Sequence, residues 1–303
     1  MKKKIIVVVI VAILFIITAI CIMNYRRLII RTALPSETQK ITRTQKISFV
    51  ALGDSLTQGI GDDALKKGYS ERLSSELAIN YGRDVLNYNF GKAGYTAQQV
   101  SDRIESSSEI KDRLKHANFV VVSVGGNDLQ QQVLQNFFTK SPDELSQAIK
   151  NSQKNYKKSL LGLFTTIRHY NSDAPIFLFG NYNPIFVYFP NRLDLNDDVR
   201  LYNTISKQVV DQNKESYYVD IFNLTFGQYK TKEEQSALQE EDKRISMKYP
   251  NNQDFFNQEK KYIKNNLIST EDNYHPNSKG YDYMTSQLIK RVKAVQYKWL
   301  IAN

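Results

Sequence analysis

Short apolar runs alternate with longer amphipathic stretches through most of this chain, and this alternation restricts the fold more than any other feature. Five runs of β-branched and aromatic residues are candidate strands, at 47–52, 85–90, 119–124, 176–179 and 217–221. A run that is apolar throughout, such as Phe119 to Val122, suits a strand buried on both faces. We therefore predict an α/β protein with a parallel sheet covered by helices on both sides.

The stretches between these runs show helical spacing. Apolar residues from Ile149 to Ile167 recur at intervals of three, four and seven residues, and the same spacing runs from Tyr281 to Trp299. Right-handed crossovers between the strands then give a three-layer α/β/α sandwich. Ligands of such folds bind beyond the carboxyl ends of the strands, which is where functional residues are to be sought.

The first 45 residues differ from the rest of the chain. Residues 5–23 carry no charge, and as a helix they would be about 28 Å long, close to the roughly 30 Å hydrocarbon core of a bilayer. We expect a transmembrane anchor at 1–23 and a polar stalk at 24–45, with a cleaved signal peptide as the alternative. The short basic tail predicts a single-pass cell-membrane protein whose folded domain, 46–303, lies on the extracytoplasmic side.

The formal net charge of +10 is concentrated near the start of the chain. Residues 1–46 hold nine basic side chains and one acidic one, a net of +8, so the remaining 257 residues carry only +2. A nearly neutral domain offers no electrostatic footprint for a phosphate backbone, and we expect no nucleic-acid partner. Within this domain, residues 226–271 are charged and poor in apolar residues. We interpret them as a helical surface insertion, with a lid as the alternative.

The first candidate strand ends in a Gly-Asp-Ser-Leu turn that would expose the hydroxyl of Ser55. A lone serine in such a turn is more often a helix cap than a nucleophile. Catalysis requires an imidazole to take its proton and a carboxylate to orient that imidazole. Asp272 and His275 precede the last helical stretch, and their spacing lets the carboxylate fold back to the ring. Taken alone, however, these two residues also fit a helix cap and a surface histidine.

Two further loops follow predicted strands, at 91–96 and 125–128. The oxyanion that forms during ester cleavage needs fixed donors. The backbone N–H groups of Ser55 and Gly94 and the side-chain amide of Asn127 could converge on it. In isolation both loops are ordinary turns. Together the four loops would bring a nucleophile, a base with its orienting carboxylate and oxyanion donors to one rim of one sheet.

This combination resembles the SGNH hydrolases, also called GDSL lipases and acylhydrolases. Four sequence blocks carry the resemblance in the family's order: 53–56, 89–94, 125–128 and 272–275. It implies a flavodoxin-like sandwich with a five-stranded parallel sheet.

The same resemblance implies a role for each matched residue. Ser55 would be the nucleophile, His275 the base, Asp272 its orienting carboxylate, and Gly94 and Asn127 oxyanion donors beside the amide of Ser55, with Gly91 as the rival glycine. The glycine pair Gly59 and Gly61 and the dipeptide 68–69 are similar to those of bacterial single-span surface lipases.

We therefore expect a serine ester hydrolase of the lipase, acylhydrolase or carbohydrate-deacetylase type that forms an acyl-enzyme on Ser55. The ester substrate would be a lipid or an acylated cell-surface glycan. Three scattered histidines and one cysteine, Cys21, give no metal-ligand spacing, so we expect no metal and no cofactor. Two alternatives remain open: an O-acyltransferase that uses the same site, and a catalytically inactive surface binding module. The aromatic loop at 181–189 would line an acyl pocket or pack against the insertion. Oligomeric state is left open.

Overall fold

The computed structural model describes residues 46–136, 141–248 and 264–300. Five parallel strands form one sheet in the order β2-β1-β3-β4-β5. Their ends lie within two residues of the predicted runs, which confirms the sheet. The strands are β1 Ile47–Gly53, β2 Val85–Gly91, β3 Phe119–Ser123, β4 Ile176–Phe179 and β5 Ser216–Val219.

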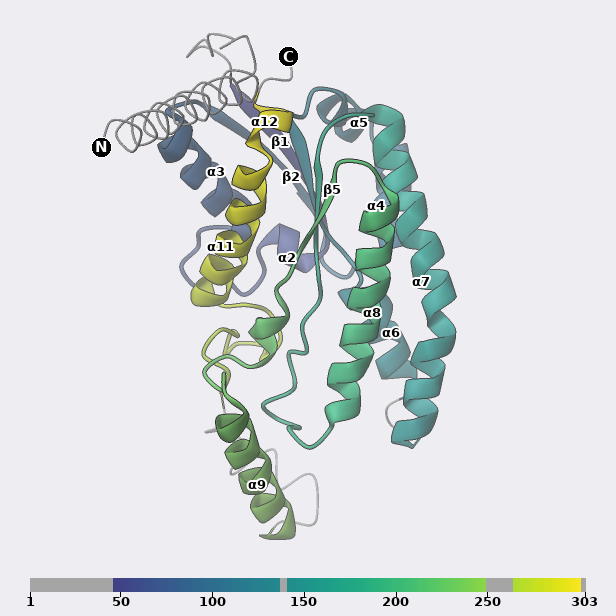
Figure 1. Ribbon diagram of the computed structural model, residues 1–303, viewed down its shortest axis with the longest axis vertical. Coiled ribbons are helices and arrows are strands. Elements are labelled where there is room, and N and C mark those ends of the chain that lie inside the picture. Colours follow the sequence, from purple (N-terminus) through teal and green to yellow (C-terminus); the bar gives the residue numbers. More distant parts are fainter. Residues whose placement is uncertain (1–45, 137–140, 249–263, 301–303) are drawn as a thin grey trace, which may run out of the picture. The chain divides into compact units, whose positions relative to one another are not determined.

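Helices cover both faces of this sheet, as Figure 1 shows, so the predicted three-layer α/β/α sandwich is confirmed. One layer holds α3 (Gly68–Tyr81), α11 (Ser278–Ala294) and α12 (Gln296–Trp299). The opposite layer holds α4 (Ala97–Ser106), α5 (Ser108–Lys115), α7 (Pro142–Tyr170) and α8 (Leu193–Gln212), and α6 (Gly126–Asn136) packs on α7.

Two apolar cores result from the two-residue period of the strands. On β3, Val120 and Val122 face the α7 layer, whereas Phe119 and Val121 face the α11 layer. The Phe119 ring stacks on Phe49 at 5.1 Å between centroids and meets Trp299 edge-on at 5.2 Å. Because both faces are packed, the apolar runs of the sequence carry no polar alternation.

The strand order reverses between β1 and β3. The connection after β1 runs to one neighbour, β2, and the connection after β2 returns past β1 to β3 on its other side. At such a switch point the loops beyond the carboxyl ends separate and leave a crevice. Ser55 begins the short helix α2 (Ser55–Gln58) just after β1. Asn127 lies in the first turn of α6 after β3, so helix replaces most of the loop predicted at 125–128. The topology thus places two of the candidate site residues at this crevice.

The last amphipathic stretch forms two helices rather than the single one predicted. Helix α11 ends at Ala294, Val295 has φ −119° and ψ 24°, and α12 begins at Gln296. The break lets the indole of Trp299 turn back and donate a hydrogen bond to the Val292 carbonyl at 2.9 Å. Periodicity did not show the break because the apolar positions on both sides of it face the same core.

The charged segment at 226–271 contains helix α9 (Lys232–Lys248), while residues 249–263 lie outside the described part. Leu238 on α9 is buried and packs with Phe186 and Val187 of the loop that follows β4. Part of the aromatic loop at 181–189 therefore contacts this segment.

The N-terminal anchor expected at 1–23 and the stalk expected at 24–45 both fall outside the described residues. Within the described ranges, no helix has the length and apolar character needed to span a bilayer.

Candidate active site

The turn after β1 fixes the backbone around Ser55. Asp54 caps the four-residue helix α2 (Ser55–Gln58), and its carboxylate accepts a hydrogen bond from the Leu56 N–H at 3.0 Å. A Cβ at Gly53 would lie 2.3 Å from the Ser123 carbonyl oxygen, so only glycine lets β1 and β3 approach this closely here. Ser55 is the first residue of α2, and its side chain is nearly buried.

Ser55, His275 and Asp272 form one hydrogen-bonded chain. His275 Nε2 lies 2.8 Å from Ser55 Oγ, and His275 Nδ1 lies 2.5 Å from Asp272 Oδ2. The serine and the histidine are 220 positions apart in the sequence. The parallel sheet brings them together because the loop after β1 and the loop before α11 meet at its carboxyl edge.

A tight turn between Asp272 and His275 lets the carboxylate fold back to the ring. Asn273 has φ 55°, a left-handed conformation that asparagine tolerates better than most residues. Asp272 Oδ1 accepts the backbone N–H groups of Tyr274 and His275 at 2.9 and 3.0 Å. Partial burial raises the pKa of Asp272, but the hydrogen bonds from the His275 ring and these backbone groups outweigh it and hold the pKa below its ordinary value. The carboxylate is therefore ionised at neutral pH.

The structure places Asn127, but not Gly94, at the cavity beside Ser55. Asn127 lines a small cavity at Ser55 of about 30 Å³, and its side-chain amide donates to the Tyr95 carbonyl at 2.9 Å. Gly94 is exposed, with φ 82°, and is not among the described residues that line this cavity. The rival Gly91 ends β2, and a Cβ there would lie 2.2 Å from the Gln58 backbone nitrogen. Close packing against α2 accounts for Gly91.

A larger apolar cavity of about 210 Å³ adjoins the small one. The two share lining residues from the start of α6, the β4–α8 loop and the loop before α11: Gly126, Asn181, Tyr182, Pro184 and Tyr274. Side chains of α6, α8 and the β4–α8 loop line the rest, among them Leu129, Ile185, Leu195 and Val199. Sequence reasoning identified the 181–189 loop but not α6 or α8, because their lining residues follow the same period as core residues.

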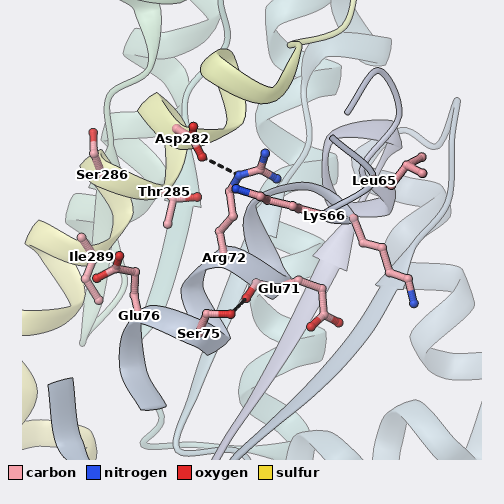
Figure 2. Close-up of a pocket in the computed structure, with 11 residues that line it drawn as sticks. Leu65, Lys66, Glu71, Arg72, Ser75, Glu76, Asp282, Thr285, Ser286 and Ile289 are labelled. Atoms are coloured by element: carbon pink, nitrogen blue, oxygen red, sulfur yellow. Dashed lines mark hydrogen bonds and ion pairs between the residues drawn. The ribbon is translucent and has the colours of Figure 1, made fainter. Parts of the chain in front are cut away.

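The most voluminous of the described cavities lies elsewhere. A groove of about 850 Å³ runs between α3 and α11 and is lined mostly by charged and polar side chains, as Figure 2 shows. Its described lining residues do not include Ser55, Asp272 or His275. Volume alone therefore does not locate the chemistry, and the hydrogen-bonded chain is the better guide.

Asp54 is a buried carboxyl group that sequence reasoning passed over. Burial raises its pKa to about 7, although hydrogen bonds from Ser123 and the Leu56 N–H lower it. Ser123 Oγ lies 2.8 Å from the carboxyl group and 2.6 Å from Thr57 Oγ1, which in turn lies 2.8 Å from Tyr69 Oη. This buried chain ties the turn that carries Ser55 to β3 and α3.

No group of three or more histidine, cysteine, aspartate or glutamate side chains within the described ranges is arranged to hold a metal ion.

The chain belongs to the GDSL-like Lipase/Acylhydrolase family, whose sequence model matches residues 51–283, and the resemblance inferred from the four sequence blocks is thereby confirmed. Together with the fold, this family match defines the protein as a carboxylic ester hydrolase.

The chain is also similar to two Bacillus proteins and shares its fold with a solved structure. The chain is 24% identical over 254 residues to the uncharacterized protein YpmR of Bacillus subtilis, covering 83% of this chain and 84% of YpmR. It is 26% identical over 144 residues to the spore germination lipase LipC of Bacillus licheniformis, covering 46% of this chain and 65% of LipC. The crystal structure of the lipase Lip_vut3 from a goat rumen metagenome shares the fold, with a TM-score of 0.59, 19% identity, and coverage of 80% of this chain and 96% of that one.

The buried Asp54 gives a prediction for stability. Its pKa is about 7 in the folded protein and about 3.8 in an unfolded chain, so the folded state holds a proton that the unfolded state releases between these values. The stability this proton contributes is complete below about pH 4 and is lost as pH rises through 7, a change of about 4 kcal/mol. Asp54→Asn keeps the cap and removes the titration. Urea unfolding should show the variant gaining stability over wild type between pH 5 and pH 8.

Asp84→Asn, at an exposed position, is the matched control and should show no such gain. A constant difference between Asp54→Asn and wild type across this pH range would contradict the buried, titrating carboxyl group.

Proposed function

We propose that this protein hydrolyses carboxylic esters through an acyl-enzyme formed on Ser55. The observation that carries the proposal is the continuous chain from Ser55 Oγ through the His275 ring to Asp272, with links of 2.8 and 2.5 Å. A serine hydroxyl is a weak nucleophile until an adjacent base takes its proton, and this arrangement provides that base and holds it in place.

The reaction proceeds in two half-reactions. His275 Nε2 takes the Ser55 proton while Oγ forms a bond to the ester carbonyl carbon, and the carbonyl oxygen becomes an oxyanion. His275 then gives the proton to the leaving alcohol as the carbon–oxygen bond breaks. In the second half, His275 activates a water molecule that attacks the acyl-enzyme, and the proton returns to Ser55 Oγ as the acid leaves.

Asp272 and Asn127 support the charges that form. Asp272, whose pKa is held low, keeps the proton on His275 Nδ1 and stabilises the imidazolium. One N–H of the Asn127 amide is held by the Tyr95 carbonyl, and an amide group carries a second N–H. We assign this second N–H and the backbone N–H of Ser55 to the oxyanion. The N–H of Gly94 stays the predicted third donor, because Gly94 does not line the cavity at Ser55.

Removing the nucleophile tests the mechanism. Ser55→Ala leaves His275 without an oxygen to deprotonate, and we expect hydrolysis of p-nitrophenyl butyrate to fall by at least about a thousandfold. The measurement is the initial rate of p-nitrophenol release by the purified protein.

Ser75→Ala, on the exposed face of α3, is the control and should keep the wild-type rate. Equal rates for wild type and Ser55→Ala would reject the proposed nucleophile.

The cavity beside Ser55 favours a fatty acyl substrate over an acetylated glycan. Its volume of about 210 Å³ and its apolar lining suit several methylene groups, whereas an acetyl group would leave most of it unfilled. Each buried methylene contributes about 0.8 kcal/mol, so affinity should rise with chain length until the cavity is full. The partial match to the spore germination lipase LipC also supports a lipid ester as the substrate.

Filling this cavity should change chain-length preference. Val199 lies on α8 and lines the cavity, so Val199→Phe should shorten it. We expect kcat/KM for p-nitrophenyl octanoate to fall about tenfold or more, while kcat/KM for the acetate ester stays within about twofold of wild type.

The acetate ester is the internal control, because it uses the same nucleophile without the cavity. A parallel loss for both esters, or no change for either, would exclude this cavity as the acyl site.

We also propose that residues 5–23 anchor the domain in the cell membrane on its extracytoplasmic side. The uncharged run of nineteen residues in the sequence supports this location. An anchored enzyme would meet lipid esters at the membrane surface, which agrees with the proposed substrate.

A further inference from the structure

A buried arginine connects the two loops that carry the proposed nucleophile and base. Arg72 lies on α3, and its side chain is 6% exposed. Its guanidinium contacts groups from two other parts of the chain. Figure 2 shows it extending from α3 toward Asp282 of α11.

The first contact is with the connecting loop, residues 59–67, which follows the nucleophile helix α2. Both terminal nitrogens of Arg72 donate to the Asp62 carboxylate, whose side chain is 1% exposed. Asp62 also accepts the Gly68 N–H at 2.8 Å. Burial raises the pKa of Asp62, but the hydrogen bonds from Arg72 and Gly68 outweigh it and lower the pKa, so the pair is ionised.

The second set of contacts is with the start of α11. Arg72 Nη2 donates to Ser278 Oγ at 2.8 Å, and Arg72 Nε donates to Asp282 Oδ1 at 2.7 Å. Ser278 is three residues beyond His275 in the sequence. A planar guanidinium can satisfy several acceptors at once in a fixed geometry, which a lysine ammonium cannot reproduce.

The connecting loop touches the base directly. A Cβ at Gly61 would lie 2.7 Å from His275 Cβ, so glycine is needed for the loop to pack against the histidine. Ile60 accepts a hydrogen bond from Tyr281 Oη at 2.7 Å, and Asp63 accepts one from the Ser278 N–H at 2.8 Å. The loop is therefore held between α2 and α11, next to the Cβ of His275.

We propose that Arg72 is a positioning residue that sets the distance between Ser55 and His275 by fastening the connecting loop to the start of α11. The proposal rests on the proposed function of Ser55 and His275. Arg72 is not among the described residues that line the two cavities at Ser55, and it acts through Asp62 on one side and Ser278 on the other. Loss of this fastening misplaces the base relative to the nucleophile, and an error of about 1 Å can lower a rate about a hundredfold.

The test compares three variants of the full chain. Arg72→Lys keeps a positive charge beside Asp62 but loses the planar set of guanidinium N–H donors. Ser278→Ala removes one acceptor of these donors and leaves the buried ion pair intact, so it remains informative if Arg72→Lys folds poorly. Arg168→Lys is the matched control, because Arg168 also joins separate segments. It donates to the carbonyls of Ala174 and Lys214, which lie just before the amino ends of β4 and β5.

Kinetics are measured with a short p-nitrophenyl ester at a temperature where circular dichroism shows every variant fully folded. We expect Arg72→Lys to lower kcat about tenfold to a hundredfold with KM within about twofold. Ser278→Ala should show a smaller loss of kcat in the same direction, and Arg168→Lys should keep the wild-type kcat. Wild-type kcat in Arg72→Lys, or an equal loss in Arg168→Lys, would overturn the proposal.

A second readout separates this proposal from the proposed function. The proton between His275 Nδ1 and Asp272 should give a far-downfield proton NMR resonance in the wild type, because the two atoms are 2.5 Å apart. We expect this resonance to shift or broaden in Arg72→Lys and to stay unchanged in Arg168→Lys. If the wild type shows the resonance but cleaves no ester, the proposed function fails. The comparison of the resonance between Arg72→Lys and Arg168→Lys still tests the positioning role. An unchanged resonance in Arg72→Lys would refute that role.

Discussion

The hydrogen bond between Ser55 and His275 is the interaction on which the proposed site depends. Its partners are 220 positions apart, so no local structure can form it. It exists because all five strands run parallel and their carboxyl ends share one edge, where the order reverses between β1 and β3. The same edge carries Asn127, in the first turn of α6. The two apolar cores that fix the sheet therefore also fix the geometry of the site.

Polar groups beneath this edge hold its loops in place. Asp54, Ser123 and Thr57 tie the nucleophile turn to β3, and Arg72 ties the connecting loop to α11. Each set places ionisable side chains where water is excluded, at a desolvation cost that only their mutual hydrogen bonds offset. These groups lie beside the proposed nucleophile and base.

The sequence predicted the parts of the structure that have a local signal. Strands buried on both faces leave unbroken apolar runs. Ser55 and Asn127 follow two of these runs, and His275 precedes the last amphipathic stretch. It did not predict the ion pair of Arg72 with Asp62, the raised pKa of Asp54 or the helix break at Val295. Those features arise from burial and from contacts between distant segments, and a charged residue in a helix has the same pattern whether it faces water or a buried partner. The role of Gly94 stays a prediction.

The covalent intermediate on Ser55 is the central claim, and one measurement addresses it most directly. The protein is treated with a fluorophosphonate, which reacts with an activated serine hydroxyl, then digested, and the modified residue is located by tandem mass spectrometry. We predict a single stoichiometric adduct on Ser55, whose hydroxyl is activated by the adjacent base. An adduct on another residue, or no adduct on a preparation that cleaves esters, would contradict it.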